Sequence, residues 1–129
     1  PPTHVDSQHN VQRDARLQPI LADAAARLGV PLRENGPVEY FPHFYGRWDG
    51  ETHPEHISIE SLLSMIDTLG RGPTEVACHP GRPEPDFETS YHRERFIELE
   101  TLLTPGLRAE LDARGVRLIS YHDLAGAAP

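Results

Sequence analysis

The fold class is decided by residues 3–33, which read THVDSQHNVQRDARLQPILADAAARLGVPLR. Apolar side chains recur through residues 17–28 at helical spacing, on one face of an α-helix, and Gly29 follows where helices commonly end. Residues 3–7 contain a β-branched alternation, and residues 30–33 are apolar and end in a charge, which predicts a strand on each side of the helix. The stretch therefore predicts a strand–helix–strand unit.

The rest of the chain continues this alternation. The expected elements are an irregular excursion or short hairpin over residues 34–56, a helix over 58–69 capped by Ser58, a strand over 74–78, an exposed loop over 82–88, a helix over 90–103, a short helix capped by Thr104 with Pro105 at its first position, and a strand over 116–120. Strands that alternate with helices call for parallel strands with helical crossovers. The sequence thus predicts an α/β fold in a single domain of residues 1–129.

The composition excludes several classes of function. The 12 basic residues against 20 acidic ones give a formal net charge of -8, which repels nucleic acid and anionic lipid. All 12 basic residues are arginine, so chemistry that needs a lysine is excluded. Cys78 is the single cysteine, and nothing resembles a membrane span or a signal peptide, so we expect a soluble, cytoplasmic protein without a disulfide. The opening Pro1-Pro2 indicates a chain that starts inside a longer one.

Polar side chains follow the predicted strands, where parallel α/β folds place their sites. They are Asp6 and the residues up to Asn10, then Arg33, His79 and the pair Tyr121-His122. If residues 3–7 alternate, His4 and Asp6 share a face, which favours a metal site or a general acid/base site. The alternative is a solvated histidine beside an aspartate that caps the next turn.

His79 stands out because an apolar strand leads directly into His79-Pro80-Gly81. It is either a functional side chain held over the strand ends or a histidine that only caps the strand. Cys78 beside it is expected to be a buried small apolar residue. In the excursion, His43, His53 and His56 offer a weak metal hypothesis, and the aromatic residues around them either cover the core or stack on a sugar ring.

Four segments in a fixed order resemble a known family. They are residues 3–12 (THVDSQHNVQ), residues 75–81 (EVACHPG), residues 91–102 with Arg95, Glu98 and Leu99, and residues 118–124 (LISYHDL). Together they resemble the YdjC-like carbohydrate deacetylases, and the match corresponds to the carboxyl-terminal half of such a protein. The resemblance implies a (β/α) barrel-like fold, a divalent metal such as Mg or Zn at the strand ends, and hydrolysis of the acetamide of an N-acetylated amino sugar.

The resemblance also assigns residues. Asp6 and His79 match family motifs and are the candidate catalytic residues, while Arg33, from its place at a strand end, and His9 are the candidate substrate-binding residues. The metal ligands are unknown, because Gln8 occupies the expected ligand position and Gln12 stands where a histidine is usual.

Two readings of function follow. The first is a metal-dependent carbohydrate deacetylase whose first half of the fold is absent here. The alternative is a catalytically impaired relative that acts as a sugar-binding or protein-interaction domain. The expected partners are an acetylated amino sugar or oligosaccharide, and either a second copy of the chain or the missing amino-terminal half.

Overall fold

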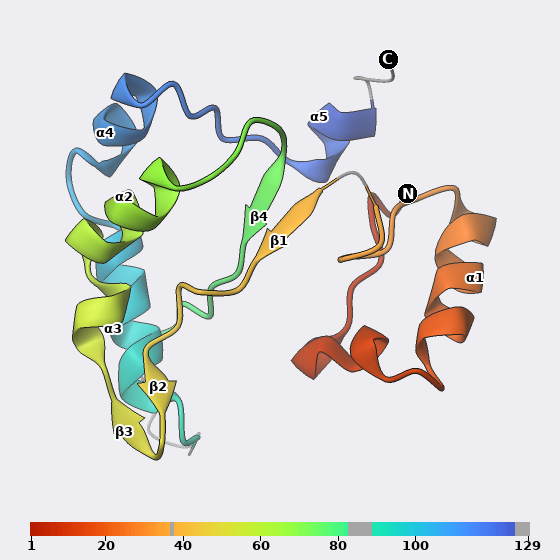
Figure 1. The fold of residues 1–129 in the computed structure, drawn as a ribbon, viewed down its shortest axis with the longest axis horizontal. Helices are drawn as coiled ribbons and strands as arrows, with labels where there is room; N and C mark the ends of the chain where they lie inside the picture. The colour runs from red at the N-terminus through yellow and green to blue at the C-terminus, as the bar shows by residue number, and fades with distance from the viewer. Residues whose placement is uncertain (37, 83–88, 126–129) are drawn as a thin grey trace. The chain divides into compact units, whose positions relative to one another are not determined.

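The computed structural model describes residues 1–36, 38–82 and 89–125. These residues group into two compact units (Figure 1). Unit 1 is Pro1–Tyr40, Gly72–Glu75 and Leu118–Pro129, and unit 2 is Phe41–Arg71 and Val76–Arg117. No helix within the described ranges is both long enough and apolar enough to cross a membrane. Most of the loop expected over residues 82–88 lies outside the described residues.

Unit 1 contains the strand–helix–strand arrangement in reduced form. Val5 and Leu32 form a parallel bridge, in which the Val5 N–H donates to Pro31 O and the Arg33 N–H donates to Val5 O, each at 2.9 Å. The pairing is parallel as predicted, but it is one bridge rather than two full strands. The pairing does not extend further because Pro31 has no N–H to donate. Residues 8–13 also turn away from it and form a 3-10 helix, η1 (Gln8–Arg13).

Helix α1 (Gln18–Leu28) confirms the first predicted helix. Gly29 ends it with a φ of 66°, in the left-handed region that glycine adopts without strain, and its N–H donates to Ala26 O at 3.1 Å. Of the predicted apolar face only Ala25 is buried, while Ile20 is 64% exposed and Leu28 is 55% exposed. The helix is therefore amphipathic in sequence but largely uncovered on its apolar face.

Strands β1 (Glu39–Phe41) and β4 (Thr74–Val76) form a two-stranded sheet. The Glu39 N–H donates to Pro73 O and the Ala77 N–H donates to Phe41 O, both at 3.0 Å, so the strands run parallel. Strand β4 confirms the strand predicted over residues 74–78, and β1 lies inside the stretch predicted as an excursion.

The short hairpin expected in residues 34–56 is present in unit 2. Strands β2 (Arg47–Trp48) and β3 (Glu51–Thr52) pair antiparallel across Asp49 and Gly50, whose φ values of 53° and 80° are typical of a two-residue hairpin turn. A 3-10 helix, η2 (Pro54–Ile57), follows the hairpin.

Three helices pack around the core of unit 2. Helix α2 (Ile59–Asp67) is capped by Ser58 as predicted, because the Ser58 hydroxyl accepts the Ser61 N–H at 3.2 Å. Helix α3 (His92–Leu102) confirms the third predicted helix, and α4 (Leu107–Ala113) is the fourth. The buried core cluster consists of Phe44, Ile57, Leu62, Leu107 and Leu111.

Three sequence-based expectations are wrong. Helix α4 is capped by Gly106 rather than Thr104, because the Leu107 N–H bonds Thr104 O in a separate turn and Gly106 has a φ of 89°. Residues 116–120 carry no strand, because no strand in the described part of the chain pairs with them. They lead instead into helix α5 (Tyr121–Ala125). Cys78 is exposed rather than buried, since β4 ends before it.

Candidate active site

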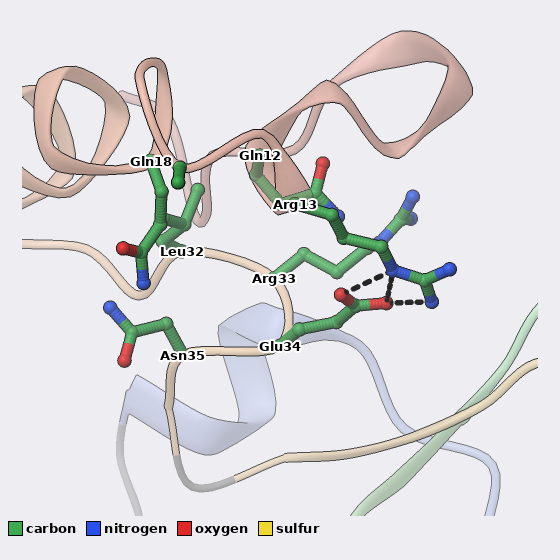
Figure 2. Close-up of a pocket in the computed structure, with 8 residues that line it drawn as sticks. Gln12, Arg13, Gln18, Leu32, Arg33, Glu34 and Asn35 are labelled. Carbon is green, nitrogen blue, oxygen red and sulfur yellow. Dashed lines mark hydrogen bonds and ion pairs between the residues drawn. The ribbon is translucent and has the colours of Figure 1, made fainter.

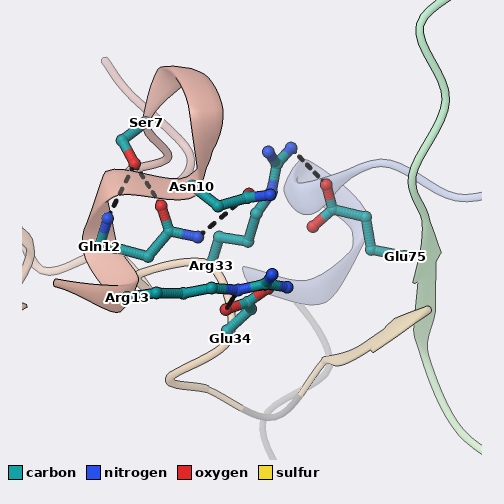
Figure 3. A network of polar contacts seen from close by, with 7 residues as sticks. All are labelled: Ser7, Asn10, Gln12, Arg13, Arg33, Glu34 and Glu75. Atoms are coloured by element: carbon teal, nitrogen blue, oxygen red, sulfur yellow. Dashed lines mark hydrogen bonds and ion pairs between the residues drawn. The ribbon is translucent and has the colours of Figure 1, made fainter. Parts of the chain in front are cut away.

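Arg33 is the centre of a group of charged side chains in unit 1. Its guanidinium lies 3.0 Å from Asp6 Oδ2 and pairs also with Glu75 Oε1 (Figure 3 draws the Glu75 pair). Asp6 follows Val5 and Arg33 follows Leu32, so the parallel bridge sets them side by side. The structure thereby brings together two of the predicted site residues, one cation between two carboxylates.

The environment of Arg33 keeps it charged and leaves one donor unused. Burial alone would lower the pKa of Arg33, but the contacts with Glu75 and Asp6 raise this pKa overall. Arg33 Nε is buried and has no hydrogen-bond partner among the residues that the structure describes. An unpaired buried N–H is costly, so this atom is suited to donate to a bound ligand.

Tyr121 and His4 extend the Arg33 group. The Tyr121 hydroxyl donates to Glu75 Oε2 at 2.7 Å, and burial and this carboxylate raise the Tyr121 pKa. The His4 ring stacks on the Tyr121 ring with centroids 4.0 Å apart. His4 and Asp6, which the sequence places on one strand face, are thus linked through Tyr121, Glu75 and Arg33.

A polar cavity of about 370 Å³ lies against this group, also in unit 1 (Figure 2). Its lining includes the side-chain amides of Gln12, Gln18 and Asn35 beside Arg33. Glu34 also lines it, and the hydrogen bond from Arg13 is the main reason why the pKa of Glu34 lies below its ordinary value. Amides and a guanidinium are suited to bind neutral, hydroxylated molecules.

The residues at the expected metal positions have other surroundings. The Gln12 side chain is buried, where its Oε1 accepts from the Ser7 hydroxyl and its Nε2 donates to Asn10 Oδ1 at 3.3 Å (Figure 3). Gln8 and His9 are exposed in η1, where His9 has a φ of 55°. Within residues 1–36, 38–82 and 89–125, no group of three or more His, Cys, Asp or Glu side chains is arranged to hold a metal ion. The donors among these described residues do not fit a divalent metal, and His43, His53 and His56 do not form the metal site that the sequence offered as a weak hypothesis.

His79 lies in unit 2, where α3 holds its backbone. The His79 N–H donates to Glu98 Oε2, and Arg95 Nη1 lies 3.4 Å from His79 O. Glu98 is fully buried, and its other oxygen, Oε1, accepts from the Tyr91 hydroxyl. Burial raises the pKa of Glu98, although the bonds from Tyr91 and His79 act in the opposite direction.

Aromatic rings surround the His79 imidazole. The Tyr45 and Tyr91 rings stack with centroids 4.7 Å apart, and the His79 centroid lies 6.2 Å from Tyr45 and 5.8 Å from Tyr91 in edge-on geometry. The Tyr91 hydroxyl accepts the Gly46 N–H at 3.0 Å. His79 is exposed, so its ring is accessible beside an ordered aromatic pair.

The aromatic residues of the excursion divide between core and surface. Phe44 is buried in the core of unit 2. Trp48 is exposed and stacks on His53 with centroids 3.7 Å apart. Phe44 therefore covers the core as one of the two possibilities expects, while the stacking of these rings on a sugar stays a prediction.

Sequence reasoning missed three residues of these groups. Glu75 precedes the end of the predicted strand by three positions, so it was not among the polar residues that follow the strand. Glu98 and Tyr91 lie in the predicted helical segment of residues 90–103, where a glutamate ordinarily faces solvent and so predicts no site. The available signal was the spacing of Glu94, Glu98 and Thr101, which places three polar residues on one helix face.

Comparisons with known proteins place the chain in one family. The family model "YdjC-like protein" matches residues 1–113. The chain is 36% identical to a carbohydrate deacetylase of Geobacillus stearothermophilus and 33% identical to a chitooligosaccharide deacetylase of Yersinia enterocolitica, over 95% of the chain in each case. It covers 51% and 53% of these two proteins, so it spans about half the length of the curated relatives it matches.

A solved structure has the same fold over most of the chain. It is described as a cellobiose-phosphate cleavage protein of Enterococcus faecalis V583, and it superposes with a TM-score of 0.78 at 25% identity. The match covers 95% of this chain and 53% of that one.

Proposed function

Because the chain belongs to the YdjC-like family, we propose that it acts in hydrolysing the acetamide of an N-acetylated amino sugar. The observation that carries the proposal is the 36% identity to a carbohydrate deacetylase over 95% of the chain. The names of the relatives favour this enzyme over the alternative of a catalytically impaired binding domain. The parallel bridge and the β1–β4 pair are consistent with part of a (β/α) barrel-like fold, which we propose for the intact assembly.

The reaction needs a nucleophilic water, a proton acceptor and a proton donor. Water oxygen bonds to the acetamide carbonyl carbon, the C–N bond breaks, acetate leaves, and the sugar amine takes up a proton. From the family motifs that the two residues match, we propose that the Asp6 carboxylate takes the proton from the water and that the His79 imidazole gives a proton to the leaving amine. Arg33 holds Asp6 in place by its 3.0 Å contact.

The polar cavity of unit 1 is the proposed sugar-binding surface of that unit. The exposed Gln18 and Asn35 amides can pair with sugar hydroxyls, and the unpaired Arg33 Nε can donate to a carbonyl or hydroxyl oxygen. His9, exposed on η1, remains a proposed second contact for the substrate. A neutral sugar suits this lining better than a phosphate, because Arg13 and Arg33 are already paired with carboxylates.

A divalent metal, Mg or Zn, is expected from the family resemblance, but the donors among the described residues are not arranged to hold one, so no step is assigned to a metal. We propose that Gln8 and Gln12 weaken metal binding here. Gln8→His together with Gln12→His should raise Zn²⁺ affinity at least about 10-fold, since imidazole is the better ligand for this ion. Isothermal titration with Zn²⁺ measures this, and Gln8→His alone serves if the buried Gln12 change unfolds the protein. Equal affinity of folded variant and wild type would contradict the proposal.

Acetate release tests the proposed function. The chain is incubated with N-acetylated chitooligosaccharides and excess Mg²⁺ or Zn²⁺, and acetate is quantified. We expect acetate from the wild type, and at least about 100-fold less from His79→Asn, which cannot donate a proton. Absence of acetate, or equal release by the two proteins, would overturn the proposal. Already deacetylated chitooligosaccharides provide the blank.

A further inference from the structure

Helix α3 carries two fully buried glutamates one turn apart, and the proposed hydrolysis uses neither. We propose that one of them, Glu98, is a positioning residue that holds the backbone of His79 and so aims its imidazole. The proposal rests on the function proposed for His79. The other glutamate, Glu94, is equally buried but bonds elsewhere, to Arg47 and Thr52.

The first argument is the anchoring of the turn that bears His79. The His79 N–H donates to Glu98 Oε2, and the Gly81 N–H donates to Arg95 O at 3.0 Å. Arg95 Nη1 approaches His79 O at 3.4 Å. These contacts tie residues 79–81 to one turn of α3, where they fix the Cα position from which the imidazole extends. A hydrogen bond that a backbone N–H donates to a carboxylate is stronger than one between two neutral groups.

The second argument is that the same carboxylate orders the rings beside His79. Glu98 Oε1 accepts from the Tyr91 hydroxyl, which itself accepts the Gly46 N–H at 3.0 Å. Tyr91 then supports Tyr45 by stacking, and both rings meet the His79 ring edge-on. Both oxygens of Glu98 are thus engaged, one with the His79 backbone and one with its ring surroundings.

The third argument concerns the cost of the arrangement. A fully buried carboxylate without a cation directly bonded to it is unfavourable, and burial raises the pKa of Glu98 accordingly. Apolar residues could pack α3 against the core without this cost. The presence of a carboxylate at position 98 is explained if its two acceptor oxygens are needed to hold His79 and Tyr91.

The test compares Glu98→Gln with Glu94→Gln in the full chain. Glutamine keeps the size of glutamate but offers a single acceptor oxygen, so Glu98→Gln cannot accept from both donors as the carboxylate does. Glu94→Gln is the matched control, because it makes the same change at a site of equal burial one turn away. Two readouts are needed, the NMR shifts of the His79 backbone amide and ring protons, and kcat and KM for acetate release.

We expect Glu98→Gln to move the His79 amide and ring signals, which report the lost hydrogen bond and the altered position against the tyrosine rings. We expect kcat to fall about 10- to 100-fold with KM within about 2-fold, as when other orienting partners are removed. Glu94→Gln should leave the His79 signals and kcat unchanged. If Glu98→Gln unfolds, Tyr91→Phe, which removes only the hydroxyl, should move the His79 ring signals and leave the amide signal in place.

The two proposals fail in different ways. His79 signals and kcat that are the same in Glu98→Gln and Glu94→Gln would overturn the positioning role, whatever the activity of the wild type. Movement of the His79 signals in Glu98→Gln alone supports the positioning geometry, even if the wild type releases no acetate and the proposed hydrolysis is therefore wrong.

Discussion

Helices α1 and α3 have eleven residues each, and they use opposite kinds of side chain on their buried faces. Helix α1 has a regular apolar face, yet it buries only Ala25. Helix α3 has little apolar periodicity, yet it buries Glu94, Glu98 and Thr101 at helical spacing. Each of these three is hydrogen-bonded, and the Thr101 hydroxyl donates to Ile57 O at 2.6 Å. The comparison shows that burial in this protein follows hydrogen-bonding partners as well as apolar pattern.

Removing the buried carboxylate of Glu98 has the largest expected effect on the stability of α3. Glu98→Ala leaves the His79 N–H and the Tyr91 hydroxyl without their acceptor and opens a space in the interior. We expect the free energy of unfolding to fall by about 2–5 kcal/mol, because each buried unsatisfied donor costs about 1–3 kcal/mol. Urea denaturation measures the change. A loss below about 0.5 kcal/mol would mean that α3 does not depend on its polar face.

The stability that the two buried glutamates contribute should change in opposite directions with pH. Burial raises the pKa of Glu98, so the stability linked to it is present below the ordinary value of 4.5 and is lost as pH rises through the folded-state pKa. Burial would also raise the pKa of Glu94, but the bonds from Thr52 and Arg47 outweigh it and lower this pKa. The stability linked to Glu94 is therefore present above 4.5 and is lost as pH falls through its folded-state pKa.

Thermal unfolding of Glu98→Gln and Glu94→Gln across this pH range checks both signs. Relative to the wild type, Glu98→Gln should gain Tm as pH rises above 4.5, and Glu94→Gln should gain Tm as pH falls below it. If the Tm of both variants, relative to the wild type, changes in the same direction with pH, the pKa values of Glu94 and Glu98 are not shifted in opposite directions.

The apolar face of α1 gives the smallest expected effect on folding. Ile20→Glu with Leu28→Glu should change the free energy of unfolding of one chain by no more than about 1 kcal/mol, because both side chains are mostly exposed. Urea denaturation of the two proteins measures the change, and a loss above about 2 kcal/mol would show that these side chains are covered in the folded protein.

The elements that the sequence predicts well are those with local causes. Helix α1 with Gly29 and helix α2 with its Ser58 cap are specified by neighbouring residues, so their positions follow from spacing alone. Strand β1 was missed because a three-residue strand is defined by its partner, β4, more than thirty residues away. The strand expected over residues 116–120 is absent because these residues have no partner strand in the described part of the chain.

The proximity of Asp6 and Arg33 could be predicted from the strand ends, whereas the contacts of Glu98 on a buried helix face could not. Asp6 and Arg33 follow paired residues, so the parallel arrangement alone brings them together. Glu98 could not be identified in this way, because a glutamate on a helix has no local signal that distinguishes a buried carboxylate from a solvated one. Only the contacts with His79 and Tyr91 reveal its role.

A double-mutant cycle on acetate release tests most directly whether Glu98 acts through His79. The four proteins are the wild type, Glu98→Gln, His79→Asn and the double variant, with kcat measured on one acetylated chitooligosaccharide. If Glu98 only positions His79, adding Glu98→Gln to His79→Asn should lower kcat no further, so the double variant equals His79→Asn within about 2-fold. Losses that multiply in the double variant would contradict the account, because Glu98 would then act independently of His79.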